Sequence, residues 1–191
     1  MKPVLVLYAT REGYTRRIAE HVAATARGRG FAVDVTDVAS IPSGIWLGSY
    51  AAVIIAASVH LGRHEREMTQ FVKRHVSEIS LIPSVFLSIS LSEAAAEDAA
   101  ATPENRARAG ADAKKMIAVF LSETGWRPTH IQAVAGALLF TRYNRVLRFV
   151  MAGIARKAGM NPDITRDYEF TDWAELDRLI DQMELPEAAV R

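Results

Sequence analysis

Five short apolar runs alternate along the chain with segments of helical periodicity, and this alternation restricts the fold more than any other feature. The runs are almost continuously apolar, as expected for parallel strands that are covered on both faces. The longer segments repeat apolar residues at the spacing of an amphipathic helix. The predicted strands are Val4–Ala9, Ala32–Val35, Ala52–Ala57, Val85–Ser90 and Ile131–Ala135, and the predicted helices are Thr15–Arg27, Arg66–Ile79, Asn105–Thr124 and Trp173–Met183.

Strand–helix alternation with short connections predicts an α/β fold, a doubly wound five-stranded parallel sheet with strand order 2-1-3-4-5. The 191 residues contain no internal repeat and no linker, so we expect a single domain over residues 1–191. Two stretches exceed a minimal fold. Leu91–Arg108 is expected to be a solvated loop that leads into a helix starting at Thr102-Pro103, and Ala137–Arg166 is too long for a simple link from the fifth strand to the last helix.

Composition excludes several classes of function. The chain has no cysteine, which excludes disulfides, thiolate metal sites and iron–sulfur clusters. Its net charge of +1 gives no general reason to expect nucleic acid as a partner. No apolar run approaches the roughly 18 residues that span a bilayer, and no signal peptide is visible, so we expect a soluble, cytoplasmic protein.

A first candidate ligand loop, Thr10-Arg11-Glu12-Gly13-Tyr14-Thr15, joins the first strand to the first helix. Free N–H groups and the helix dipole favour an anion at such a helix start, Gly13 permits close backbone approach, and the threonines offer hydroxyl donors. The loop suits a phosphomonoester. An ordinary helix cap at Thr15 behind a turn glycine explains the same residues. Neither a P-loop nor G-x-G-x-x-G is present, which disfavours a nucleoside triphosphate or a Rossmann dinucleotide.

Two further loops end at the same edge of the predicted sheet. Ser58-Val59-His60-Leu61-Gly62-Arg63 follows the third strand, and Ser90-Leu91-Ser92 follows the fourth. Gly62 permits a peptide flip, and His60 and Arg63 offer positive charge to a ligand. The serines either line a pocket or form hydrogen bonds with the backbone groups at the strand ends. The i,i+4 pair His60 and His64 is a weak metal signal without HExxH, so no metal site is predicted. The sequence singles out no catalytic acid or base.

Six pieces of the chain, taken in order, resemble one family. They are Tyr8–Gly13, Ala56–Val59, Gly125–Pro128, Ala135–Leu138, Thr141–Tyr143 and Phe170–Trp173. Together they are similar to the menaquinone-dependent protoporphyrinogen IX dehydrogenases, flavodoxin-like bacterial enzymes of haem biosynthesis. The resemblance implies that FMN binds with its phosphate at Thr10–Thr15 and its ring between the other two loops. It also implies an insertion at about 138–166 that interrupts strand 5, with Asp167–Phe170 resuming the strand.

The insertion has an unusual charge distribution. Trp126–Pro162 contains no acidic residue and six basic ones, so this segment is +6 although the whole chain is +1. On a helical wheel four arginines fall on one arc: Arg142, Arg145, Arg148 and Arg156. The opposite side holds Tyr143, Val146, Leu147, Val150, Met151, Ile154 and Ala158, and only Phe149 and Lys157 break this division. A basic amphipathic helix of this kind fits an anionic membrane surface, and equally an ordinary helix that packs its apolar face on the domain. Arg142, Arg145 and Arg148 are therefore candidates for contact with a membrane or with a substrate.

These observations favour an FMN-dependent oxidoreductase. The resemblance implies that it oxidises protoporphyrinogen IX, or a related reduced substrate, and passes the electrons to a membrane quinone, docked on the inner face of the cell membrane. Two alternatives stay open at this point. One is a flavodoxin-type electron carrier with no small-molecule substrate of its own, and the other is a flavin-free binding module.

Overall fold

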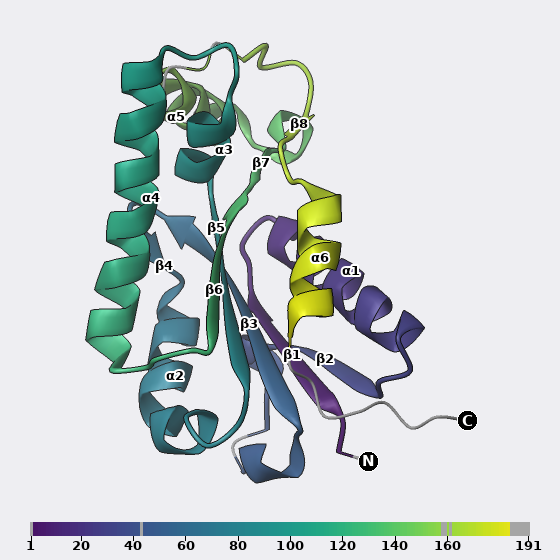
Figure 1. Ribbon diagram of the computed structural model, residues 1–191. Helices are drawn as coiled ribbons and strands as arrows, with labels where there is room; N and C mark the ends of the chain where they lie inside the picture. Colours follow the sequence, from purple (N-terminus) through teal and green to yellow (C-terminus); the bar gives the residue numbers. More distant parts are fainter. Residues whose placement is uncertain (1, 43, 158–159, 161, 184–191) are drawn as a thin grey trace.

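The central sheet has the expected strand order. The computed structural model describes residues 2–42, 44–157, 160 and 162–183. Its five parallel strands are arranged β2-β1-β3-β5-β6, which is the order 2-1-3-4-5 of the main strands (Figure 1). A short strand, β4, folds back antiparallel on the end of β3. The bounds are β1 Val4–Ala9, β2 Val33–Asp37, β3 Ala52–His60, β4 Arg63–His64, β5 Ser84–Ser90 and β6 His130–Ala135.

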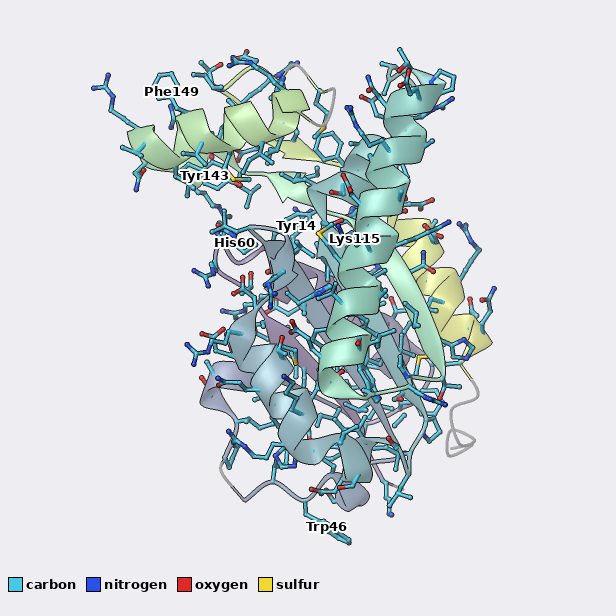
Figure 2. The ribbon with its side chains drawn as sticks, turned by 90° about the vertical axis from the view of Figure 1, so that its left-hand side faces the viewer. Tyr14, Trp46, His60, Lys115, Tyr143 and Phe149 are labelled. Carbon is cyan, nitrogen blue, oxygen red and sulfur yellow. The ribbon has the colours of Figure 1, made fainter. Side chains whose placement is uncertain are left out.

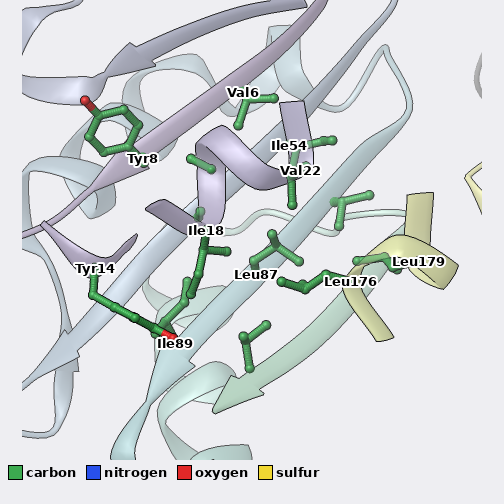
Figure 3. Packing of buried hydrophobic residues seen from close by; sticks show 14 of the residues in the cluster. Val6, Tyr8, Tyr14, Ile18, Val22, Ile54, Leu87, Ile89, Leu176 and Leu179 are labelled. Atoms are coloured by element: carbon green, nitrogen blue, oxygen red, sulfur yellow. The ribbon is translucent and has the colours of Figure 1, made fainter. Parts of the chain in front are cut away.

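Helices cover both faces of this sheet. Helices α1 (Tyr14–Gly28) and α6 (Trp173–Gln182) lie on one face, and α2 (Arg66–Ile79) and α4 (Pro103–Thr124) lie on the other (Figure 1). Alternate residues of β1 enter two separate cores: Val4 and Val6 face α1, while Leu5 and Leu7 face α2. Figure 3 shows the first core, where α1 and α6 side chains meet those of the strands. Burial on both faces explains why the strands are continuously apolar.

The stretch after β5 is more ordered than expected. Helix α3 (Leu91–Glu97) begins directly at the end of the strand, where the Ser90 side chain accepts a hydrogen bond from the Glu93 N–H at 3.0 Å. The prediction of a solvated loop over this stretch is therefore wrong as far as Glu97. The serine acts as a helix cap, for which its hydroxyl is well suited. The next helix, α4, starts as expected behind a Thr102 cap with Pro103 in its first turn.

The insertion leaves the main sheet at Gly136. The following strand, β7 (Ala137–Leu138), pairs antiparallel with β8 (Tyr168–Glu169) in a separate two-stranded sheet. Residues 167–170 therefore do not resume the fifth strand beside β5, because Phe170 N–H donates to Gly136 O and holds the returning chain against β7. Between the two strands lie the short helix η3 (Phe140–Arg142) and α5 (Arg145–Lys157). Residues 158–159 and 161 of the insertion lie outside the described residues.

Candidate functional site

The loop from β1 to α1 forms an open helix start. Gly13 adopts a left-handed conformation (φ +86°) and precedes α1 without any side-chain cap on the helix. Its own N–H donates to Thr10 Oγ1 at 3.0 Å, which shapes the turn. Thr15 is buried in the first turn of α1. Because the first N–H groups of a helix have no partner within it, this end of α1 presents donors and a positive dipole to an anion. The cap at Thr15 that the sequence also allowed is absent from this turn.

Arg11 pairs with a carboxylate beside the neighbouring loop. Its Nε lies 2.9 Å from Oε2 of Glu65, a carboxylate that is only 4% exposed. The hydrogen bond to Glu65 raises the pKa of the Arg11 guanidinium. Ser58 Oγ also donates to Glu65, at 3.3 Å. Arg11 and Ser58 thus connect the first two candidate ligand loops through Glu65. The sequence does not single out Glu65, because one glutamate before a helix is no indication of a binding site.

The loop after β3 is a tight hairpin. Val59 pairs with His64 and His60 with Arg63, which leaves Leu61 and Gly62 as a two-residue turn. Both turn residues have positive φ, 49° and 78°, as this hairpin type requires. Leu61 is 86% exposed at the tip. The hairpin borders a cavity of about 460 Å³ that α2 and α4 close on its other sides.

Two polar residues of this hairpin have partners inside the protein. Arg63 Nη1 lies 2.7 Å from Glu123 Oε1 on α4. His64 is buried against the rings of Phe86 and Phe120, and its Nε2 lies 2.8 Å from Ser88 Oγ. Burial lowers the pKa of His64 to about 4, so the imidazole is neutral at pH 7. In the described part of the chain no group of three His, Asp or Glu residues is arranged to hold a metal ion.

The third predicted loop is the start of α3. Ser90 is buried and caps this helix, while Leu91 and Ser92 are half-buried in its first turn. Gly136 packs closely here: a Cβ at this position would lie 3.4 Å from Ser90 O. Ser90 therefore shapes the edge of the sheet, and Leu91 and Ser92 border the edge from the side of α3.

The first part of the insertion lies beside the start of the first helix, and the chain that returns from the insertion is bonded to that helix. Tyr14 OH lies 2.9 Å from Thr171 Oγ1, which in turn donates to Ala135 O at 2.6 Å. Arg17 forms an ion pair with Glu169 of β8. On the other side, Arg142 of η3 places Nη1 3.8 Å from the position of a Cβ on Gly13. Sequence reasoning missed the contacts with Gly13, Tyr14 and Arg17 because their partners lie more than 100 residues away along the chain.

The arginines of the predicted basic arc differ in exposure. Arg142, in η3, and Arg145 are exposed, whereas Arg148 is half-buried, with its Nη2 3.5 Å from Tyr143 O. Ala152 and Ala155 are the buried side chains of α5, and Val146, Phe149, Val150 and Ile154 are exposed. Figure 2 shows Phe149 on the outer side of α5 and Tyr143 on the side facing the rest of the molecule. None of the described helices is long and apolar enough to span a membrane.

Comparison with known proteins identifies the family. Residues 5–165 match the model of a family described as flavodoxin domain. The chain belongs to the flavodoxin domain family. It is 32% identical over 173 residues to the protoporphyrinogen IX dehydrogenase [quinone] of Escherichia coli K12, covering 90% of this chain and 89% of the relative. A Leishmania major protein of the same name is 31% identical over 175 residues, covering 91% of this chain and 71% of the relative.

Solved structures agree on the fold of this flavodoxin domain. A short-chain flavodoxin associated with a bacterial microcompartment has a TM-score of 0.51 at 12% identity, over 70% of this chain and 84% of its own. A flavo-diiron protein from Thermotoga maritima has the same TM-score at 11% identity, over 96% of this chain and 35% of its own. Family membership indicates FMN as the cofactor. The edge described above fits it, since the uncapped α1 and Gly13, which has no Cβ, leave room for a phosphate.

Proposed function

We propose that this flavodoxin-domain protein is an FMN-dependent protoporphyrinogen IX dehydrogenase that uses a quinone as electron acceptor, and so acts in haem biosynthesis. The observation that carries the proposal is the similarity, along nine-tenths of the chain, to two relatives with that name from distant organisms. The +6 segment supports an enzyme over a flavodoxin-type carrier, because an electron carrier usually presents an acidic face to its protein partners.

The residues at the edge of the sheet have distinct roles in this proposal. Tyr14 and Thr15 hold the FMN phosphate with their backbone N–H groups at the start of α1, together with the threonine hydroxyls. Gly13, whose N–H is bonded to Thr10 Oγ1, leaves room for the phosphate, and Glu12 lies in the same loop. The hairpin residues Val59, His60, Leu61 and Gly62 border one side of the flavin ring, and Leu91 and Ser92 the other. Arg11, Ser58, Arg63 and Ser90 fix the positions of these loops through Glu65, Glu123 and the α3 cap. When bound, FMN supplies two-electron transfer from the reduced substrate and onward to the quinone.

Helix α5 suits contact with the membrane in which a quinone dissolves. Its exposed apolar side chains are Val146, Phe149, Val150 and Ile154, and Phe149 is 68% exposed. Exposed Arg145 and Arg156 lie on the same side of the helix, and the sequence around them has no acid from residue 126 to 162. Apolar side chains flanked by arginines are typical of helices that lie in an anionic membrane surface. We therefore propose a cytoplasmic protein that binds the inner face of the cell membrane through α5.

An anaerobic assay tests the activity. FMN-loaded protein is mixed with protoporphyrinogen IX and a menaquinone analogue, and porphyrin fluorescence is followed in the absence of oxygen, which prevents spontaneous oxidation. We expect porphyrin to form only when protein, FMN and quinone are all present. A protein that binds FMN and accepts electrons from a reductase, yet forms no porphyrin, would instead be an electron carrier. A protein that binds no FMN after reconstitution would be a flavin-free binding module.

A further inference from the structure

The inserted segment places a positive side chain over the predicted phosphate loop. Arg142 ends η3, and its Nη1 lies 3.8 Å from the position that a Cβ on Gly13 would occupy. Gly13 has no Cβ, so the guanidinium lies close above the backbone at which α1 begins. Arg142 therefore approaches the N-terminus of α1, where the helix dipole already places partial positive charge.

The backbone that carries Arg142 is fixed in place. Phe140 is fully buried, and Tyr143 is 7% exposed with its hydroxyl oxygen 3.2 Å from Leu139 N. Thr141 donates from its N–H and its hydroxyl to Asp167, at 2.8 and 2.7 Å. Anchors on both sides of residue 142 fix its backbone, so that the exposed Arg142 side chain needs only its own torsions to reach the loop.

The charge on Arg142 is not neutralised by a direct partner. Within the described residues its guanidinium forms no hydrogen bond or ion pair, and Asp167, which attracts it from farther away, is held by Thr141. A cation beside a helix N-terminus is electrostatically unfavourable, and an anion between the two relieves this repulsion. A phosphate monoester suits the place, since a guanidinium donates two parallel hydrogen bonds to phosphate oxygens.

We infer that Arg142 binds the phosphate of FMN from the side opposite α1, so that the insertion is part of the cofactor site and selects FMN over the phosphate-free riboflavin. The inference rests on the FMN cofactor of the proposed function, but not on the substrate or the quinone. The insertion then binds the cofactor in addition to contacting the membrane. The contacts of Tyr14 with Thr171 and of Arg17 with Glu169 hold the chain that returns from the insertion on the same helix, α1.

Flavin titrations test this assignment. Flavin-free protein is titrated with FMN and separately with riboflavin, and binding is followed by the quenching of flavin fluorescence. We expect Arg142→Ala to weaken FMN binding on the order of 10- to 100-fold, the range of a lost charge-assisted hydrogen bond, and to leave riboflavin binding within about twofold. Arg145→Ala, the matched control three residues away, removes the same charge from an equally exposed side chain that is not among the atoms within 4 Å of the Gly13 Cβ position, and it should change neither affinity. Arg142→Gln should behave like Arg142→Ala, which covers a failure of the alanine variant to fold.

Three outcomes would overturn the inference. Unchanged FMN affinity in Arg142→Ala or Arg142→Gln means that Arg142 does not reach the phosphate. Equal losses for FMN and riboflavin mean that Arg142 shapes the site without binding the phosphate. An equal loss of FMN affinity in Arg145→Ala means that the insertion acts through its overall charge. Failure of the wild-type protein to bind FMN at all is distinguishable from these, because it removes the cofactor of the proposed function as well.

Discussion

At the scale of single residues, His64 shows how burial controls protonation. Its imidazole lies among Phe86 and Phe120, with Ser88 as its hydrogen-bond partner, and burial lowers its pKa from 6.5 to about 4. Between these two values the unfolded chain binds a proton at this site and the folded chain does not. The stability that the neutral imidazole contributes is therefore present above pH 6.5 and is lost as the pH falls toward 4.

This predicts a specific difference between the wild-type protein and His64→Gln. From pH 7.5 to pH 5 the wild-type protein should lose about 2 kcal/mol of unfolding free energy at this site, and the variant should lose none there. Urea unfolding of both proteins at the two pH values measures it. The test compares the loss of unfolding free energy between the two proteins, because other groups titrate in the same range. Burial and neighbouring acids raise the pKa of Glu97 to about 7, so this carboxyl group adds stability as the pH falls. Parallel pH profiles for the two proteins would contradict the prediction.

At the same scale, the sequence predicts the hydrogen-bond donors of the loop Thr10–Thr15 but not the partners of that loop. Glycine, threonines and a helix start lie within six consecutive residues, so a turn at Gly13 that allows close backbone approach could be predicted, and the structure gives it a φ of +86°. The pairing of Arg11 with Glu65 and the approach of Arg142 to Gly13 could not, because both depend on how distant segments pack. A local sequence pattern indicates which hydrogen-bond donors a loop contains. Only the folded structure shows which of these donors already have partners within the protein.

At the scale of elements, α5 shows what helical periodicity leaves open. The wheel separates arginines from aliphatic residues, but small residues decide the packing: Ala152 and Ala155 allow close approach to the domain, and the larger Phe149 and Val150 are left outside. A helix with apolar residues on most of its circumference has no single buried side that its sequence alone can define. The strands are easier to predict, because a short, continuously apolar run indicates a strand that is buried on both faces of the sheet.

The exposed side of α5 predicts membrane binding that two serine substitutions remove. Phe149→Ser with Val150→Ser should reduce co-sedimentation with anionic vesicles at least about tenfold, because inserting each of these side chains contributes roughly 1.5–3 kcal/mol. Added salt should weaken the binding of the wild-type protein, since Arg145 and Arg156 each add about 1 kcal/mol near an anionic surface. Leu81→Ser is the control, an exposed apolar residue between α2 and β5 at the other end of the sheet. Equal, negligible binding of the wild-type protein to anionic and neutral vesicles would rule out membrane docking.

At the scale of the whole molecule, the insertion is part of the domain core. Phe140, Tyr143, Ala152, Ala155 and Met160 belong to the same buried cluster as Val4 of β1 and Leu176 of α6. The sequence pattern predicts the sheet, and the family resemblance implies the insertion. Neither predicts that the two share a core, because an apolar strand pattern indicates that a strand is buried but not which element covers it. The antiparallel pair β7 and β8 brings the two ends of the insertion together, with Leu138 opposite Tyr168.

Replacing residues 139–167 by a short Gly-Ser linker between Leu138 and Tyr168 tests this shared core. The linker can close because those two residues are paired, and the five-strand sheet does not depend on the insertion for its hydrogen bonds. The far-ultraviolet circular dichroism of a folded α/β protein should therefore remain. Its stability should fall by several kcal/mol, since loss of one buried phenylalanine alone typically costs about 3–5 kcal/mol. Guanidinium unfolding measures the loss, and full-length Phe149→Ser, altered only at an exposed position, should stay within about 0.5 kcal/mol of wild type. A shortened chain as stable as the full one would mean that the insertion is an independent appendage, and the closeness of Arg142 to Gly13 would then be a contact that the fold does not need.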